Sequence, residues 1–271
     1  MTTKKRIDIE IKNNIAHVSL ARPDKHNALD MTMFQSIIDT IKTLKKDRSL
    51  RAIILSGQGP DFCTGLDVKS VLKSSKGGPI KLLLKINPWS SNIAQKVSTG
   101  WKKIPVPVIA AIHGRCWGGG LQIALGADFR IATPDSSFSI MEGRWGLIPD
   151  MGGTLALREL CQMDVAKELA MTARLIDGKQ AHSAGIITHV SEQPLEHAQN
   201  LANELIEQSP DTLAAVKKLY NKSWLSRAGT VLMRETVYQL KIIMGKNSKI
   251  KSYNQTHKPE EHKKFSQRKK W

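Results

Sequence analysis

The sequence predicts an α/β fold in which short buried strands alternate with amphipathic helices. Hydrophobic residues make up 41% of the 271 residues, which is enough for a substantial core and excludes a disordered chain. Residues 52–55 and 106–112 are short apolar runs, each followed within two residues by a glycine, and such runs indicate buried strands. Stretches with helical spacing of apolar residues lie between and after them.

The first 60 residues predict a hairpin, a helix and a strand. Apolar and polar residues alternate on both sides of a turn at Asn13-Asn14, which predicts the hairpin. The alternating apolar residues are Ile7, Ile9, Ile11, Ala16, Val18 and Leu20. Asp30 is expected to cap a helix whose apolar residues follow the helical repeat: Phe34, Ile37, Ile38, Ile41 and Leu44. The apolar run 52–55 then forms a short buried strand.

The middle of the chain predicts strands and turns, and the second half is mostly helical. Residues 74–79 are expected to form a loop, and residues 106–112 a strand that leads to the glycine triplet 118–120, where a helix begins. Further short strands are expected at residues 129–132, 138–141 and 186–190. Asp164 is expected to cap a helix over residues 165–173, and amphipathic helices are expected at 195–206 and after Pro210.

The length allows one large domain or one domain with an appendage. We expect an α/β core over residues 1–200 and a C-terminal helical region over residues 201–271. The longest apolar run is too short for the ~20 residues of a membrane span, and no signal peptide is visible. Cys63, Cys116 and Cys161 match neither a disulfide framework nor a metal site, so reduced thiols and a cytoplasmic protein are expected.

The charge balance is strongly positive. The chain has 41 Lys and Arg against 24 Asp and Glu, a formal net charge of +17, and residues 245–271 alone hold nine Lys or Arg and two acidic residues. Such a field attracts polyanions in general, including nucleic acid, acidic lipid and phosphorylated small molecules. A solvated tail that aids solubility explains the C-terminal charges equally well.

Two glycine-containing segments, each after an apolar strand, are candidate binding loops. Residues 62–67 read Phe-Cys-Thr-Gly-Leu-Asp, and residues 117–122 read Trp-Gly-Gly-Gly-Leu-Gln. Three glycines before a helix would present free backbone N–H groups, which suit an oxyanion or a phosphate. Ile123 stands where a dinucleotide-binding G-x-G-x-x-G motif needs its third glycine, and the chain has neither a P-loop nor a G-x-S-x-G elbow. Tight turns made for packing are the alternative explanation.

Four carboxylates lie near these segments. Asp67 is expected to cap a helix, and Asp128 to make a structural hydrogen bond. Glu142 and Asp150 flank a loop broken by glycine and proline, residues 143–149, which can fold both carboxylates toward one pocket. Mutual repulsion and apolar neighbours would raise their pKa values and suit them to proton transfer near neutral pH.

Several segments in order carry a recognisable pattern. They are residues 22–29 (RPDKHNAL), 62–67 (FCTGLD), 107–114 (PVIAAIHG), 118–120 (GGG), 146–149 with 152–154 (GLIP with GGT), and 265–270 (FSQRKK). Their order and spacing together resemble the crotonase superfamily, which is the enoyl-CoA hydratase/isomerase family, over nearly the whole chain.

The resemblance implies a spiral of repeated ββα units with a C-terminal helical region that forms trimers or pairs of trimers. It implies a CoA thioester as substrate, without a further cofactor or a metal. The backbone N–H groups of Leu66 and Gly119 would form an oxyanion hole for the thioester. The implied substrate-binding residues, with Phe265 covering CoA in the same or a neighbouring copy, are Lys25, Ala28, Leu29, Thr64, Gly65, Leu66, Gly118, Gly119, Gln122 and Phe265.

Two positions depart from the pattern that the resemblance implies for hydratases. Such enzymes carry one glutamate after the triplet, where this chain has Gln122, and a second one where it has Glu142. An amide cannot exchange protons near neutral pH, so Gln122 is expected to be a polar lining residue. Asp150 stands where hydratases commonly have glycine and where the dienoyl-CoA isomerase branch has aspartate, although that branch also has an acid at the Gln122 position.

These observations lead to the hypothesis of an acyl-CoA enzyme that shifts a double bond in an enoyl- or dienoyl-CoA, with Glu142 and Asp150 as proton carriers. Hydration of a 2-enoyl-CoA is the alternative reaction, and thioester hydrolysis, decarboxylation or C–C cleavage could use the same kind of site. The net charge leaves an RNA-binding protein on the same scaffold as a further alternative, although no basic stretch interleaved with aromatic residues is present.

Overall fold

The computed structural model describes residues 5–73, 78–85 and 87–271. Within these ranges, a six-stranded sheet has the order β1-β2-β3-β4-β6-β8. Its strands are β1 (Ile7–Lys12), β2 (Ile15–Leu20), β3 (Ala52–Gly57), β4 (Val108–Ile112), β6 (Phe129–Ala132) and β8 (His189–Val190). β1 and β2 form the predicted antiparallel hairpin, and the other neighbours pair in parallel. A separate small sheet pairs β5 (Arg115–Trp117) with β7 (Ser137–Ser139).

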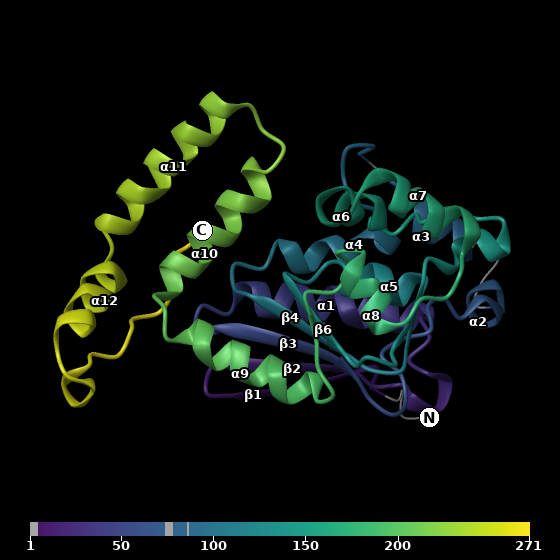
Figure 1. Ribbon diagram of the computed structural model, residues 1–271, viewed down its shortest axis with the longest axis horizontal. Helices are drawn as coiled ribbons and strands as arrows, with labels where there is room; N and C mark the ends of the chain where they lie inside the picture. Colours follow the sequence, from purple (N-terminus) through teal and green to yellow (C-terminus); the bar gives the residue numbers. More distant parts are fainter. Residues whose placement is uncertain (1–4, 74–77, 86) are drawn as a thin grey trace.

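Helices cover both faces of the larger sheet (Figure 1). α1 (Met31–Lys46), α4 (Ile93–Lys102) and α5 (Gly119–Ala124) contribute to the larger core on one face, and α9 (Pro194–Ile206) packs on the other. Along β3, Ile53 and Leu55 point into the larger core, whereas Ile54 points into the smaller core beneath α9. A strand buried on both faces needs apolar residues at successive positions, which explains the continuous apolar run at 52–55.

The elements mostly begin where the sequence predicts, with local differences. Asp30 caps α1 as predicted, because its carboxylate accepts a hydrogen bond from the Met33 N–H (N···O 2.7 Å). Asp164 instead lies in the first turn of α7 (Met163–Thr172) and accepts a hydrogen bond from the Val165 N–H. The strand predicted at 186–190 is reduced to β8, because the N–H groups of residues 186 and 187 bond back to the Ala181 carbonyl.

Short helices surround the ends of β3, β4 and β7. They are η1 (Pro23–Lys25), α2 (Val68–Lys73), α3 (Gly78–Leu83), η2 (Met141–Trp145), α6 (Gly153–Leu160) and α8 (Gly178–Ser183). The strand predicted at 138–141 therefore gives way to η2 after Ser139. Of the loop predicted at 74–79, residues 74–77 lie outside the described residues, and Gly78 begins α3.

The C-terminal helices extend away from the sheet (Figure 1). α10 (Pro210–Ser223), α11 (Ala228–Ile243) and α12 (Lys246–Thr256) are followed by η3 (Pro259–Glu261) and a final segment that returns to α10. There, the Lys269 N–H and the Trp271 indole both donate to Asp211 Oδ1. The expected boundary between residues 200 and 201 falls inside α9, a helix that covers the sheet, so the projecting helices begin only after Ile206. The division into two regions stays a prediction.

None of the helices in the described ranges combines the length and the apolar character needed to cross a membrane.

Candidate active site

A cavity of about 630 Å³ opens beside the carboxyl ends of β3 and β4. Ligands of parallel α/β sheets bind at this end of the strands, and the volume suits a ligand of small-molecule size. The segments that follow the two strands line the cavity, together with α2, α3 and the loop after β7. The structure brings these candidate residues together in its lining: Thr64, Gly65, Leu66, Gly118, Gly119, Glu142 and Asp150.

The two glycine loops contact each other through their backbones. The Trp117 N–H donates to the Cys63 carbonyl (N···O 3.0 Å). Gly65 has a φ of +87°, and a side chain at this position would lie 2.9 Å from the Trp117 carbonyl oxygen and 3.3 Å from the Gly119 nitrogen. Only glycine therefore allows this approach, which fixes the segment after β3 against the segment after β4.

The backbone N–H groups of Leu66 and Gly119 are available to a ligand. Gly119 is the first residue of α5, and Leu66 lies in the neighbouring loop. Among the described residues, neither N–H donates a hydrogen bond to a protein group. Two free donors on contacting loops that line one cavity suit a carbonyl oxygen that gains negative charge during a reaction.

Glu142 has one carboxylate oxygen held and the other unpartnered. Gln122 Nε2 donates to Glu142 Oε1 over 2.6 Å, whereas Oε2 is buried without a hydrogen-bond partner among the described residues. Burial raises the pKa of Glu142, and the nearby charge of Asp150 acts in the same direction, although hydrogen bonds from its own backbone and from Gln122 lower it. Oε2 is therefore the Glu142 oxygen that has no hydrogen bond to the described protein.

Asp150 lies on the wall of the same cavity, half-buried. Burial raises the pKa of this carboxyl group above its usual value, and its own backbone hydrogen bond only partly offsets the effect. The turn at Gly146, which has a φ of +66°, reverses the chain between the two carboxylates. The loop thus places two proton carriers with raised pKa values on one cavity, which suits acid–base chemistry.

Gln122 lies behind Glu142 and does not line this cavity, in contrast to its expected role. Gln122 is buried, with only 2% of its surface exposed to solvent. Oε1 accepts hydrogen bonds from the Met151 and Gly153 N–H groups, both over 2.9 Å, while Nε2 donates to Glu142. Gln122 therefore joins Glu142 to the turn that follows Asp150.

Lys25, Ala28 and Leu29 lie next to the cavity without lining it. Leu29 is fully buried and forms a short parallel bridge with Leu66, so it supports the loop that carries one of the free N–H groups. Lys25 is the exposed last residue of η1, directly before His26, which does line the cavity.

Phe265 lies at the opposite end of the sheet. Its ring stacks under the guanidinium group of Arg51, 5.1 Å from carbon to ring centroid, and Arg51 directly precedes β3, whereas the cavity follows the end of β3. Phe265 therefore does not reach the cavity of its own chain. A cover supplied by a neighbouring copy stays a prediction.

The other carboxylates considered from the sequence have structural roles. Asp67 accepts hydrogen bonds from the N–H and hydroxyl of Ser70 and forms an ion pair with Arg22. Asp128 accepts a hydrogen bond from the Val108 N–H and forms an ion pair with Lys217. Both follow the sequence-based expectation.

A polar cluster at the cavity mouth has no counterpart in the sequence analysis. Asp61 accepts hydrogen bonds from the Arg115 backbone N–H and guanidinium group over 2.7–2.8 Å, and His26 Nδ1 lies 2.8 Å from Asp61 Oδ2. Burial alone would raise the pKa of Asp61, but Arg115 and His26 outweigh it and lower the pKa to about 2. The three residues are distant in the sequence, so no spacing pattern marks them.

Comparison with known proteins identifies the family. The family model described as enoyl-CoA hydratase/isomerase matches residues 10–266. The chain belongs to the enoyl-CoA hydratase/isomerase family. The crotonase fold class predicted from the sequence is thereby confirmed, as is the prediction of a hydratase or isomerase of this family.

Several curated relatives are similar over most of this chain. The human mitochondrial methylglutaconyl-CoA hydratase is 33% identical over 220 residues, which are 79% of this chain and 62% of the human protein. The enoyl-CoA isomerase/hydratase fer4 of Mycosarcoma maydis is 33% identical over 75% of both chains. The 1,2-epoxyphenylacetyl-CoA isomerase of Escherichia coli K12 is 29% identical over 84% of this chain and 87% of its own length.

Solved structures agree with the fold. The enoyl-CoA hydratase of Bacillus anthracis superposes with a TM-score of 0.79 at 26% identity, over 89% of this chain and 92% of that chain. A Mycobacterium smegmatis enoyl-CoA hydratase has a TM-score of 0.85 at 20% identity, over 95% and 99% of the two chains, and supports the fold alone.

Proposed function

We propose that this family member shifts a double bond in an enoyl- or dienoyl-CoA. One arrangement carries the proposal: Glu142 and Asp150, both with raised pKa values, share a cavity with the free N–H groups of Leu66 and Gly119. Moving a double bond beside a thioester needs proton removal at one carbon, proton delivery at another, and stabilisation of the enolate between the two steps.

In the proposed reaction, ionised Glu142 removes a proton from carbon 2 of a 3-enoyl-CoA through its carboxylate. The electron pair forms a dienolate, whose oxygen accepts hydrogen bonds from the Leu66 and Gly119 N–H groups. Protonated Asp150 then donates a proton to carbon 4, which gives the 2-enoyl isomer. A proton passes from Glu142 back to Asp150, so the cycle consumes no proton. Each preorganised donor contributes on the order of 3 kcal/mol to the stability of the transition state.

The contacts of Gln122 favour isomerisation over hydration. A hydratase must orient and activate a water molecule beside the alkene. Both lone pairs of Gln122 Oε1 already accept backbone N–H groups, and one Nε2 proton is donated to Glu142. The Gln122 oxygen therefore has no lone pair left to accept a hydrogen bond from a water molecule.

Hydration of a 2-enoyl-CoA is the second candidate reaction, because one similar relative is a methylglutaconyl-CoA hydratase and another an isomerase/hydratase. In that reaction, Glu142 would activate the water and Asp150 would protonate carbon 2.

A panel of 3-enoyl-, dienoyl- and 2-enoyl-CoA, with products identified by mass spectrometry, distinguishes the two reactions. Isomers keep the mass of the substrate, whereas hydration adds one water. We expect isomers, and we expect Asp150→Asn to slow their formation while the exposed Asp135→Asn control does not. Hydration products alone, with an Asp150→Asn enzyme as active as the wild type, would contradict the isomerase proposal.

We also propose that a CoA thioester is the substrate without a further cofactor, and that the copies assemble as trimers or pairs of trimers through α11. This helix has no buried residue in the single chain. It exposes Leu232, Met233, Val237, Leu240 and Ile243, and such a patch marks an interaction surface. The three free cysteines support a reducing, cytoplasmic location.

A further inference from the structure

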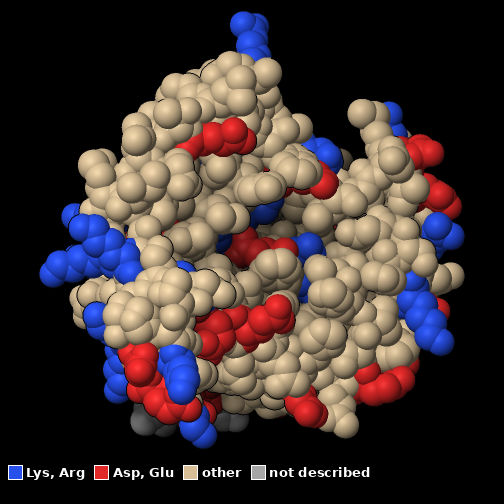
Figure 2. All heavy atoms as spheres, turned by 60° about the vertical axis from the view of Figure 1, so that its left-hand side comes forward, with Lys and Arg blue, Asp and Glu red and all other residues tan. Residues whose placement is uncertain are grey.

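The positive charge of the chain is gathered in places rather than spread evenly. On the face that Figure 2 shows, most lysine and arginine side chains lie toward the margins, whereas acidic side chains lie both in the central hollow and along the lower and right-hand margins. The described lining of the catalytic cavity contains two basic residues of the Lys or Arg type, Arg115 and Arg144. The cavity therefore accounts for little of the formal net charge of +17.

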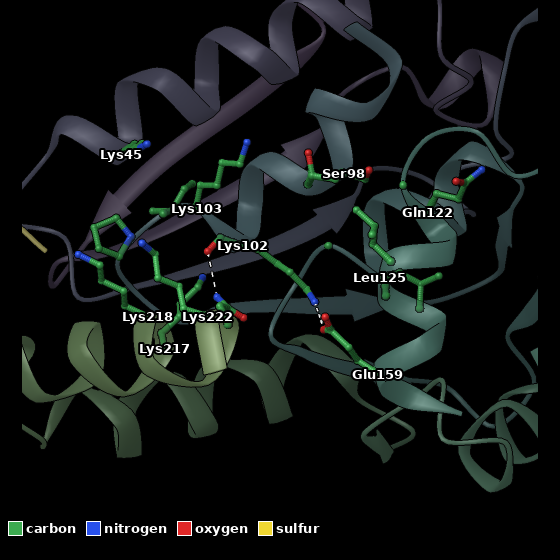
Figure 3. A pocket seen from close by; sticks show the side chains of 18 of the residues that line it. Lys45, Ser98, Lys102, Lys103, Gln122, Leu125, Glu159, Lys217, Lys218 and Lys222 are labelled. Carbon is green, nitrogen blue, oxygen red and sulfur yellow. Dashed lines mark hydrogen bonds and ion pairs between the residues drawn. The ribbon is translucent and has the colours of Figure 1, made fainter. Parts of the chain in front are cut away.

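A second cavity, of about 420 Å³, lies between the core and α10 (Figure 3). It shares no described lining residue with the catalytic cavity. Its walls come from α1, α4, α5, α6 and α10, with Trp271 at the side. The described lining has one acidic residue, Glu159, and seven basic ones: Lys45, Lys102, Lys103, Arg158, Lys217, Lys218 and Lys222.

Two of these cations already have partners within the protein. Lys217 Nζ lies 2.6 Å from the Asp128 carboxylate and donates to the carbonyls of Trp101 and Val106, so it holds α10 against the core. Lys102 forms an ion pair with Glu159. Glu159, the acidic residue of the described lining, is thus already paired with Lys102.

The other five cations have no ion-pair partner among the described residues: Lys45, Lys103, Arg158, Lys218 and Lys222. Lys218 and Lys222 lie on α10, across the cavity from Lys103 at the end of α4 (Figure 3). Burial lowers the pKa of Lys218, and the charges of Lys222 and Lys241 lower it further. A bound anion would relieve this repulsion.

Uncharged side chains form the rest of the described wall. Ser98, Thr99, Gln122 and Asn221 are polar, and the apolar side chains are the larger group. They are Ile104, Pro105, Leu125, Leu155, Ala156 and Ala214. The cavity thus offers an apolar surface beside a concentrated positive field, which suits an organic molecule that carries several negative charges.

We propose that this cavity binds a small phosphorylated molecule with two or more phosphate charges, of the chemical class of nucleoside diphosphates. Lysine ammonium groups bind phosphate as separate point charges, whereas an arginine guanidinium group can bind two phosphate oxygens at once. The four unpaired lysines and Arg158 can therefore surround a diphosphate from several sides. The volume of about 420 Å³ is in the range of small-molecule sites. The two cavities have separate described linings, and Gln122, which lines this one, donates its Nε2 hydrogen bond to Glu142 in the other.

Calorimetric titration of the full-length protein with inorganic pyrophosphate and with ADP tests the proposal. We expect saturable binding of one molecule per chain, tighter for ADP because of the apolar wall. The double variant Lys103→Gln/Lys222→Gln is expected to weaken binding at least about tenfold while its acyl-CoA activity stays at the wild-type level. The matched control Lys12→Gln/Lys167→Gln removes the same charge from exposed positions outside the cavity and is expected to bind as the wild type does.

Three results would overturn the proposal. Equal weakening in both double variants would mean unspecific attraction by the net charge. Binding of pyrophosphate to Lys103→Gln/Lys222→Gln that is as tight as to the wild type would place the anion outside this cavity. Tighter binding of a long RNA oligonucleotide than of ADP, with the same loss in the cavity variant, would mean a nucleic-acid surface in place of a small-molecule site.

Discussion

At the residue scale, the amide of Gln122 holds three groups at once. It donates to the Glu142 carboxylate and accepts the N–H groups of Met151 and Gly153. A carboxylate at this position could accept the same two N–H groups but would face Glu142 across 2.6 Å. Two carboxylates at such a distance cannot both ionise readily, so the identity of this residue sets the pH range in which Glu142 is a base.

We predict that Gln122→Glu raises the pKa of Glu142. In a plot of kcat against pH, the acid limb should therefore shift to higher pH by at least about one unit. The base must be ionised to act, so a higher pKa removes activity at the lower pH values. Gln122→Ala also loses a hydrogen bond that favours the ionised form, and it is expected to shift the limb less. The difference between the acid limbs of the two variants measures the effect of the added charge. Identical acid limbs for Gln122→Glu and Gln122→Ala would contradict the prediction.

Some of these residue roles could be predicted from the sequence and others could not. Glu142 and Asp150 flank a broken loop, and Leu66 and Gly119 follow glycines after apolar strands, so local order marks them. The role of Gln122 depends on Met151 and Gly153, which only the fold brings to its amide oxygen. The local sequence around Gln122 therefore does not indicate that this polar residue is buried.

At the scale of the secondary-structure elements, Asp61 connects the segment after β3 with β5. Its carboxylate accepts the Arg115 backbone N–H as well as the guanidinium group, so it holds the start of β5 in place. The glycine triplet follows directly after β5. A disturbance at Asp61 is therefore transmitted to one of the two free N–H groups.

Asp61→Asn is predicted to destabilise the protein by about 1 to 2 kcal/mol at pH 7. The pKa of Asp61 is held at about 2, below its ordinary 3.8. Its contribution to stability is therefore complete above the ordinary pKa and is lost as the pH falls toward 2. Urea unfolding at pH 7 and pH 3 should show a smaller difference between variant and wild type at pH 3. Asp135→Asn, at an exposed position, should change little at either pH, and a difference for Asp61→Asn that is independent of pH would argue against this account.

Local sequence patterns are sufficient to predict the boundaries of some secondary-structure elements and not of others. Asp30 and the apolar repeat behind it predict α1 correctly. α4 and α8 begin with capping boxes, Asn92 with Gln95 and Asp177 with Gln180, so the sequence carries a local signal for their starts. β5 and β8 are two or three residues long and are defined by their partners, which a local pattern cannot specify.

At the scale of the whole molecule, α11 exposes an apolar face, which we propose as the contact between copies of the chain. Leu232 is 62% exposed and Leu240 is 55% exposed, and α11 contacts its own chain mainly through α10 and α12. We predict that Leu232→Glu/Leu240→Glu converts the proposed trimers or hexamers into monomers, because a carboxylate would have to be buried in the interface.

Light scattering after size-exclusion chromatography measures this change. Asn200→Glu/Asn203→Glu adds the same charge to exposed positions of α9 and should leave the mass unchanged. A wild-type protein that is already monomeric, or a Leu232→Glu/Leu240→Glu variant that keeps the wild-type mass, would exclude α11 as the interface.

The overall architecture follows from the sequence more closely than the path of its C-terminus. Buried apolar runs and the order of the family segments predict the crotonase fold, which the comparisons confirm. The position of Phe265 depends on how the last segment returns along Asp211 and Arg51, and no local pattern encodes that path. The basic cavity likewise collects residues from five helices, and only the fold places them around one space.

The central claim is that Glu142 moves a substrate proton beside the thioester, and conversion of a 3-enoyl-CoA in D2O tests it most directly. The wild type should form the 2-enoyl isomer with deuterium at carbon 4, because Asp150 exchanges its proton with solvent before donating it. Glu142→Gln should slow this conversion at least about 100-fold, whereas Glu168→Gln, on the exposed face of α7, should not. A Glu142→Gln enzyme that forms the isomer at the wild-type rate would contradict the account.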